Sequence, residues 1–303
     1  MGQIAAMFGQ FGLAAEMYWD ETISAVLGRS ADRGWADIHP LKDDATGEIL
    51  SKQYQDKDCL VSLLHYYIES GMSPIIGLPG HVVVALGVAY DDNKQVFRDG
   101  NIVLNTDFLS GIVVNDDNCE PYRLAQRHQN DKEGDDLYHC DSIDSMVVPM
   151  PEKVFLVAEK AEITATALAN ELGPPTTSDD QFLRRLYCTS SRNYKEFRRA
   201  SSDQFLTKLV ELPLPHFIWV TEFTSLPDKD SESDDGVLVE IAVDATAGQF
   251  DDHPYVWIRY PQFMIINWQR IYGETAAKQP FGYYYVDASL TLRQFTGNLR
   301  CFS

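Results

Sequence analysis

A histidine and a group of acidic residues stand at the ends of two short apolar runs that have the character of strands. His81 follows Gly80 and opens a β-branched run, and a second such run ends in Asn115, Asp116 and Asp117. If the two strands pair, a carboxylate from the second can reach the imidazole of the first, fix its tautomer and stabilise its protonated form. The pattern therefore predicts two members of a nucleophile–base–acid triad. His81 is the general base and Asp116 the orienting acid, with Asn115 or Asp117 in close support.

The nucleophile of such a triad has to be sought among five scattered cysteines. Cys59 stands at the start of an expected helix, where the helix dipole favours a thiolate, although the neighbouring Asp58 opposes it. Cys119 lies beside the acidic corner, but Glu120 next to it disfavours a thiolate. For both residues the alternative is a small apolar side chain in the core. The remaining three have no catalytic constellation around them: Cys140, Cys188 and Cys301.

Helices and an antiparallel sheet are expected to position these residues. Apolar residues at helical spacing predict a buried helix from Gly2 to about Gly12, followed by a second short helix. Asp58 is the predicted N-cap of a helix from Cys59 to about Ser70. Short β-branched runs between residues 74 and 118, separated by turn residues, predict a mostly antiparallel sheet. These elements make a helix-first, sheet-second domain over residues 1–150.

The pattern restarts after residue 150, so residues 151–303 are expected to form a second α+β half. A strand-like run at 153–158 leads to helical patterns at 158–172 and 179–211, and strands dominate the rest. A basic cluster falls on the predicted helices, where it can pair with acidic residues of the same chain. The charged stretch at 121–142 is predicted to be a solvated loop. The fold class is therefore α+β, and the second half is an extension of the first sheet or a domain of unknown role.

Three segments of the first half occur together in a recognisable order. They are GMSPII at 71–76, GHVVVALG at 80–87 and Asn115-Asp116. Together they resemble papain-like cysteine peptidases, and most closely the bacteriocin-processing peptidases, over roughly residues 1–122. In that family a cysteine begins the first helix, a small-residue turn and a strand lead to the histidine, and the aspartate follows a further strand. The resemblance implies papain-like amino-terminal helices packed on the sheet, and a hydrolase of the peptidase or isopeptidase class with a peptide or protein as substrate or partner.

The residue before Gly2 departs from this family pattern. The family's cysteine stands just before the glycine of the first helix, whereas this sequence has Met1 there, and a thioether cannot ionise or attack a carbonyl. The family's oxyanion-hole glutamine, shortly upstream of the cysteine, has no counterpart before Met1. Two interpretations stay open. The nucleophile lies upstream of Met1 in a longer protein, or the chain is a catalytically silent relative, a pseudoenzyme that binds a peptide or partner.

A metal-dependent hydrolase is a distant alternative. His81, Asp116 and Asp117, with His139 as a fourth ligand, could hold zinc. However, the sequence contains no ligand pair at the fixed spacing of a zinc motif. Neither a metal nor a cofactor is therefore expected.

The composition disfavours several classes of partner. The 25 Lys and Arg residues against 45 Asp and Glu residues give a net charge of −20, which repels phosphate backbones and anionic lipid, so neither nucleic acid nor membrane is an expected partner. Scattered cysteines without a C-x-x-C pair indicate a reducing compartment. No Lys or Arg precedes Arg29, as the start of a signal peptide would require, and no apolar run approaches the length of a membrane span. The sequence therefore predicts an acidic, cytoplasmic protein.

Overall fold

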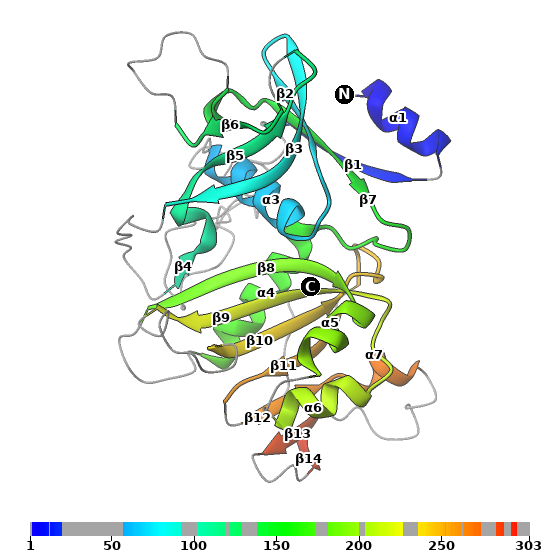
Figure 1. Ribbon diagram of the computed structural model, residues 1–303. Helices are drawn as coiled ribbons and strands as arrows, with labels where there is room; N and C mark the ends of the chain where they lie inside the picture. The colour runs from blue at the N-terminus through cyan, green and yellow to red at the C-terminus, as the bar shows by residue number, and fades with distance from the viewer. Residues whose placement is uncertain are drawn as a thin grey trace, which may run out of the picture. The chain divides into compact units, whose positions relative to one another are not determined.

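The computed structural model describes residues 2–11, 13–19, 57–91, 102–118, 121–128, 138–173, 181–199, 204–226, 236–251, 253–261, 263–273, 283–287 and 292–295. Their contacts divide the chain into two units. The first takes the described residues up to Glu152 except Ile102 and Val103, and the second takes those two residues and the described residues from Lys153 onward. Each unit has its own mostly antiparallel sheet and a few helices (Figure 1). The predicted α+β fold class is confirmed.

The first unit is built on a sheet with the strand order β1-β7-β2-β3-β5-β6. Neighbouring strands in it pair antiparallel. Helix α3 packs on β3, and helix α1 packs on β1 and β7. The elements are α1 (Gly2–Gln10), β1 (Ala14–Trp19), α3 (Lys57–Glu69), β2 (Ile75–Leu78), β3 (His81–Tyr90), the 3-10 helix η2 (Asn105–Phe108), β5 (Leu109–Asn115), β6 (Arg123–Gln126), the 3-10 helix η3 (Cys140–Ser142) and β7 (Ser145–Met150).

Helix α3 is a central helix of this unit. Residues 60–67 are all buried, and most of them are apolar. A helix that is apolar on every side is one that other elements surround. The predicted helix from Cys59 to about Ser70 is confirmed, but α3 begins at Lys57, so Asp58 lies inside the first turn and not at the predicted N-cap position. Gly71 follows the helix with a φ of +72°, a conformation that glycine adopts without steric cost.

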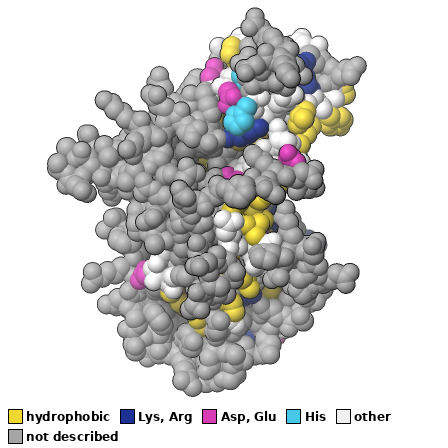
Figure 2. Space-filling view, turned by 90° about the vertical axis from the view of Figure 1, so that its left-hand side faces the viewer, with side chains coloured by type: hydrophobic (Ala, Val, Ile, Leu, Met, Phe, Trp, Pro, Cys, Tyr) yellow, Lys and Arg dark blue, Asp and Glu magenta, His cyan; other side chains and the backbone are white. Residues whose placement is uncertain are grey.

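The amino-terminal segment differs from its prediction in two respects. Helix α1 forms, but it is not buried, because Met7 and the following Phe11 are exposed, Phe11 by 75%. Exposed apolar side chains are yellow in Figure 2. The segment after α1 is strand β1, not a second helix. It pairs with β7, and the alternation of a strand turns Tyr18 inward and Met17 outward. The Tyr18 hydroxyl lies 2.6 Å from the Tyr67 hydroxyl of α3, which ties β1 to the central helix.

The second unit is built on a sheet with the strand order β14-β13-β12-β11-β10-β9-β8-β4, in which β8 to β14 form an antiparallel meander. Helix α4 contacts β8, β9 and β10, while α5 and α6 contribute to an apolar cluster with residues of β9, β10 and β11. Among the described helices of both units, none has the length and the apolar character that crossing a membrane requires. The elements are β4 (Ile102–Leu104), α4 (Ala158–Leu172), β8 (Phe182–Ser190), α5 (Ser191–Arg198), α6 (Gln204–Glu211), β9 (Phe217–Ser225), β10 (Val237–Asp244), β11 (Tyr255–Arg259), β12 (Phe263–Ile266), α7 (Trp268–Tyr272), β13 (Tyr283–Asp287) and β14 (Leu292–Phe295).

Helices cover both faces of this second sheet. Ile218 and Val220 of β9 belong to the apolar cluster that α5 and α6 complete. Trp219, which alternates with them, points to the other face and donates its indole N–H to the Leu156 carbonyl. On that face Phe223 of β9 pairs in register with Arg184, whose side chain reaches Glu162 of α4. The double covering explains why the central strands are buried along most of their length.

Three sequence predictions for the second half need correction. The helix predicted over 179–211 is strand β8 followed by α5 and α6, because Phe182 and Leu186 alternate inward while Arg184 finds a buried partner on α4. The strand-like run at 153–158 does not form a strand. Because Arg184 and Arg185 lie on β8, the basic cluster is partly on a strand and not on helices alone. The later strands at β9 to β13 are confirmed, as is helix α4 over 158–172.

Candidate functional site

The turn between β2 and β3 fixes the position of His81. Gly80 precedes it with a φ of +74°, which an L side chain rarely adopts, and His81 then pairs with Leu78 across the hairpin. Residues two apart on a strand share a face, so His81 points to the same side of β3 as Val83 and Ala85. Both are buried, and α3 packs on β3. The imidazole therefore stands at the end of the sheet face that α3 covers.

Strand β5 delivers Asp116 to the same place. It pairs antiparallel with β3, and Asn115 lies opposite Val84, so the end of β5 meets the start of β3. The predicted neighbourhood of these two strands is confirmed. Asp116 follows two residues after the buried Val114 and is itself buried. Both functional side chains therefore approach one corner of the sheet from adjacent strands.

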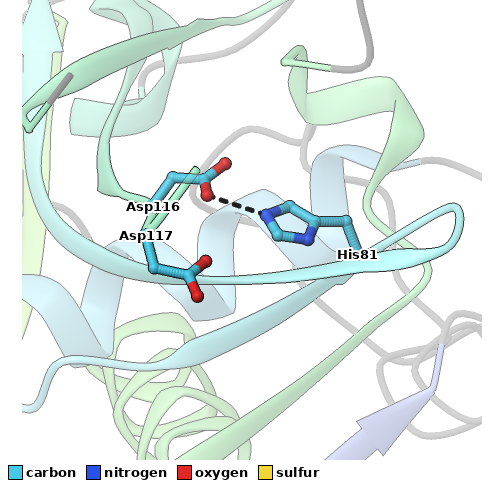
Figure 3. A group of neighbouring side chains, drawn as sticks. All are labelled: His81, Asp116 and Asp117. Carbon is cyan, nitrogen blue, oxygen red and sulfur yellow. Dashed lines mark ion pairs between the residues drawn. The ribbon is translucent and has the colours of Figure 1, made fainter. Parts of the chain in front are cut away.

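The imidazole and the carboxylate point toward one another, as Figure 3 shows. His81 Nε2 lies 2.9 Å from Asp116 Oδ1, and the two side chains are 27% and 0% exposed. The Nε2 atom is buried, and its contact with Oδ1 is close but lacks the alignment of a good N–H···O hydrogen bond. Engagement of Nε2 by the carboxylate leaves Nδ1 as the ring nitrogen that can exchange a proton with a nucleophile.

Asp116 is held by groups on both of its oxygens. The Tyr138 hydroxyl donates to Oδ2, and the backbone N–H of Asn118 donates to Oδ1 at 2.8 Å. The guanidinium carbon of Arg123 lies 3.7 Å from the centre of the Tyr138 ring. The Tyr138 hydroxyl, then the Asn118 N–H and then His81 lower the pKa of the Asp116 carboxyl below its ordinary value, against the opposing effect of desolvation. The carboxylate therefore stays charged to a lower pH than an ordinary aspartate does.

Asp116→Asn is expected to destabilise the protein in a way that depends on pH. Because the folded pKa lies below the ordinary 3.8, the charged carboxylate contributes its full stability above that pH and loses the contribution as the pH falls through the folded value. The difference in unfolding free energy between wild type and Asp116→Asn should be constant from about pH 5 to 8 and shrink below about pH 4. Denaturant titrations of both proteins at pH 7, 5 and 3 measure it. A difference that stays the same at pH 3 would contradict the lowered pKa.

The other predicted site residues lie at or near the same corner. Asn115 and Asp117 are exposed, and the nearest donor atoms of His81, Asp116 and Asp117 lie within 4.8 Å of one another. This is the group of described residues in which a metal could be held. His139, predicted as a fourth ligand, is not part of the group.

The cysteines fall into two classes in the structure. Cys140 and Cys188 are free thiols in the core, and burial raises the pKa of Cys140 to about 12 and that of Cys188 well above its ordinary value, so neither is a thiolate near neutral pH. Cys59 lies on the first turn of α3. Nothing beyond this backbone position is described for it. Cys119, Cys301 and Met1 lie outside the described residues.

Tyr138 is a site residue that the sequence did not indicate. It belongs to the stretch at 121–142 that was predicted to be a solvated loop, yet part of that stretch is strand β6 and Cys140 is fully buried. One local feature of the sequence does point to Tyr138. An aromatic residue two positions before a cysteine breaks the polar character of the loop and indicates a return to the core.

The basic cluster of the second unit, which includes Arg184 and Arg198, has partners within the unit. Arg184 pairs with Glu162, and Arg198 pairs with Glu222 and Glu240, so the predicted pairing of the basic cluster with acids of the same chain is confirmed. The carboxylate at Asp244 accepts hydrogen bonds from the N–H and hydroxyl of Thr246, as expected of a turn.

Comparison of the chain with protein-family models, with curated proteins and with solved structures finds no match. The chemistry therefore follows from the side chains themselves. An imidazole that a buried carboxylate engages at one nitrogen can accept a proton at the other and stabilise the resulting positive charge. That arrangement activates a thiol or hydroxyl nucleophile.

Proposed function

We propose that the protein is a papain-like cysteine hydrolase of the peptidase or isopeptidase class, in which His81 is the general base and Asp116 orients it. The observation that carries the proposal is the 2.9 Å contact between His81 Nε2 and the buried Asp116 carboxylate. A carboxylate with a purely structural role does not require an imidazole partner at the rim of the sheet. A carboxylate that orients a general base requires one, because the base must be accessible to solvent and substrate.

Helix α3 supports Cys59 as the nucleophile. His65 Nε2 lies 2.6 Å from the Tyr90 hydroxyl, which donates to Glu69 at 3.2 Å, so the carboxyl half of α3 lies beside the carboxyl end of β3. The proposal requires the amino end of α3, which packs on β3, to lie toward the end of the sheet where His81 stands. Cys59 is on the first turn of that end, where the helix dipole stabilises a thiolate.

The alternative position for the nucleophile precedes Gly2, at the start of helix α1. Helix α1 packs on β1 and β7, and the strands β7 and β2 separate β1 from β3 in the sheet. At about 4.8 Å per strand this puts β1 some 14 Å from the strand that carries His81. With Cys59 as the nucleophile, the oxyanion-hole glutamine of the resembling family also has candidates shortly upstream. Gln53 and Gln55 precede Cys59 in the sequence, although both lie outside the described residues.

The proposed reaction needs no group beyond these residues and water. The Cys59 thiol transfers its proton to His81 Nδ1, and the thiolate attacks the substrate carbonyl carbon to form a C–S bond. Collapse of the tetrahedral intermediate breaks the C–N bond, and His81 returns the proton to the leaving amine. His81 then takes a proton from water, which hydrolyses the thioester and regenerates the thiol. Asp116 stabilises the imidazolium in each half-reaction.

Alkylation by iodoacetamide tests the nucleophile without knowledge of the substrate. At pH 6, Cys59 of the folded protein is expected to react about a hundredfold faster than Cys140 and Cys188, whose buried thiols are internal controls. His81→Ala should slow Cys59 by about tenfold or more at pH 6, because the imidazolium partner is lost. Peptide mass spectrometry locates each alkylated cysteine. Equal reactivity of Cys59 in both proteins would contradict the assignment and leave the silent, peptide-binding relative as the better reading.

A metal-dependent hydrolase has one observation in its favour, the proximity of donor atoms on His81, Asp116 and Asp117. Against it, both oxygens of Asp116 already accept hydrogen bonds, from Asn118 and Tyr138. Metal analysis of the purified protein separates the two mechanisms. One equivalent of zinc, lost in His81→Ala together with the activity, would replace the cysteine mechanism by the metal one.

A further inference from the structure

The Asp116 carboxylate would be free to rotate if His81 and Asn118 were its only partners. Asp116 follows the last residue of β5, and its Oδ1 atom carries both the 2.9 Å contact to His81 Nε2 and the hydrogen bond from the Asn118 N–H. Two contacts on one oxygen leave the Cβ–Cγ torsion weakly determined. The hydrogen bond from the Tyr138 hydroxyl to Oδ2 fixes the plane of the carboxylate and keeps Oδ1 turned toward the ring.

Tyr138 is itself anchored on three sides. Its carbonyl accepts a hydrogen bond from the Gln126 N–H of β6 at 3.1 Å, and the next residue bridges to the same strand. Arg123 at the start of β6 covers the Tyr138 ring. Strand β6 pairs with β5, whose end leads to Asp116. The hydroxyl is therefore delivered from the strand beside the one that carries the acid, which makes its position as rigid as the sheet.

We propose that Tyr138 is a positioning residue that holds the Asp116 carboxylate in the orientation that supports His81. The inference rests on the proposed hydrolase function, but the ring and carboxylate geometry can be tested without it. The charged groups that face the carboxylate here are His81, the exposed Asp117 and Arg123, which reaches it through the Tyr138 ring. The group that donates to Oδ2 is the Tyr138 hydroxyl.

Tyr138→Phe removes only the hydroxyl, and Tyr122→Phe is a matched control, because Tyr122 is 72% exposed on the same segment. The first readout is the ¹⁵N NMR spectrum of the His81 ring, which reports the tautomer of the neutral imidazole. In the wild type the proton is expected on Nε2, facing the carboxylate. Tyr138→Phe should shift the tautomer ratio toward that of Asp116→Asn, and Tyr122→Phe should leave it at the wild-type value.

The second readout is the alkylation of Cys59 by iodoacetamide. Tyr138→Phe is expected to slow it roughly three- to tenfold at pH 6, where the thiolate depends on its imidazolium partner, and to leave it unchanged at pH 9. A merely structural defect would change the rate at both pH values. If Cys59 of the wild type does not react quickly at pH 6, the proposed function fails, while the NMR readout still decides the role of Tyr138.

A wild-type tautomer ratio in folded Tyr138→Phe overturns the inference. Should that variant fail to fold, Arg123→Gln provides the second test, since it keeps the hydroxyl but removes the guanidinium that holds the ring. It should change the tautomer ratio in the same direction by a smaller amount. A folded Arg123→Gln protein with an unchanged His81 spectrum would overturn the inference equally.

Discussion

His81→Ala is expected to lower kcat/KM for peptide hydrolysis by about a thousandfold or more. The imidazole is the group that both takes the proton from the nucleophile and returns it to the leaving amine, so its removal affects both halves of the reaction. The buried Asp116 carboxylate cannot substitute for it, because its oxygens are directed at Asn118, Tyr138 and the imidazole. A fluorogenic peptide library provides the substrate for the measurement.

His128→Ala is the matched control for this substitution. His128 lies in the same unit, its side chain is 66% exposed, and its partner is Asp141 at 3.5 Å. It should retain kcat/KM within about twofold, since an exposed pair contributes little. Equal losses in the two variants would indicate a general effect of removing a histidine. A His81→Ala protein of undiminished activity would end the proposed role of the imidazole.

The two members of the site that the sequence predicted are those whose signal is local. His81 follows a glycine turn at a strand start, and Asp116 follows a β-branched run, so each position depends on a few neighbouring residues. The two side chains come together because the two strands pair antiparallel. Short β-branched runs with turn residues between them favour such pairing. The contact between Tyr138 and Asp116 could not be predicted from neighbouring residues, because a charged stretch separates the two in the sequence and strand β6 brings Tyr138 to the site.

The parts of the fold that the sequence missed depend on distant partners. Strand β8 has Arg184 at an inward position. A charged residue there breaks the apolar–polar alternation that identifies a strand, and its partner, Glu162 of α4, cannot be read from the local sequence. Strand β1 consists of residues that suit a helix or a strand, and its pairing with β7 decides between the two. Strand β4 is three residues long and joins the sheet of the second unit although it lies in the first half of the chain. No local pattern encodes such a connection.

The second unit contains a buried network of ion pairs, and its disruption is expected to cause a large loss of stability. Arg198 of α5 is 1% exposed, and its Nη2 atom donates to Glu222 at 2.6 Å and to Glu240 at 2.7 Å. Tyr194 and Trp257 donate to Glu240, so the carboxylate oxygens are satisfied as well. Burial, followed by the like charge of Glu240, raises the pKa of Glu222 above its ordinary value. The two buried carboxylates thus share the Arg198 guanidinium, and Arg185 Nη1 lies 4.0 Å from Glu222.

Arg198→Met is expected to reduce the free energy of unfolding of the second unit by about 3–5 kcal/mol, because it removes the buried cation that two buried carboxylates share. The carboxylates can relieve the repulsion by taking up a proton, which becomes harder as the pH rises. A raised folded pKa for an acid means stability that is lost as the pH rises through it, so the deficit should be larger at pH 8 than at pH 5. Denaturant titration of the full chain, followed by the fluorescence of the buried Trp219 and Trp257, measures both values.

Two further variants decide whether the loss comes from the unpaired charges. Arg192→Met on the same helix is the control, since that arginine is 85% exposed and its partner among the described residues is the exposed Glu196, and it should change stability by less than about 0.5 kcal/mol. Combining Arg198→Met with Glu222→Gln and Glu240→Gln removes every charge of the network while keeping the amide oxygens as acceptors for Tyr194 and Trp257. Because an apolar replacement of a whole buried pair is often neutral, the triple variant should recover most of the lost stability and its pH dependence should disappear. A triple variant as unstable as Arg198→Met alone would show that the packing of the arginine stem, and not its charge, holds α5 on the sheet.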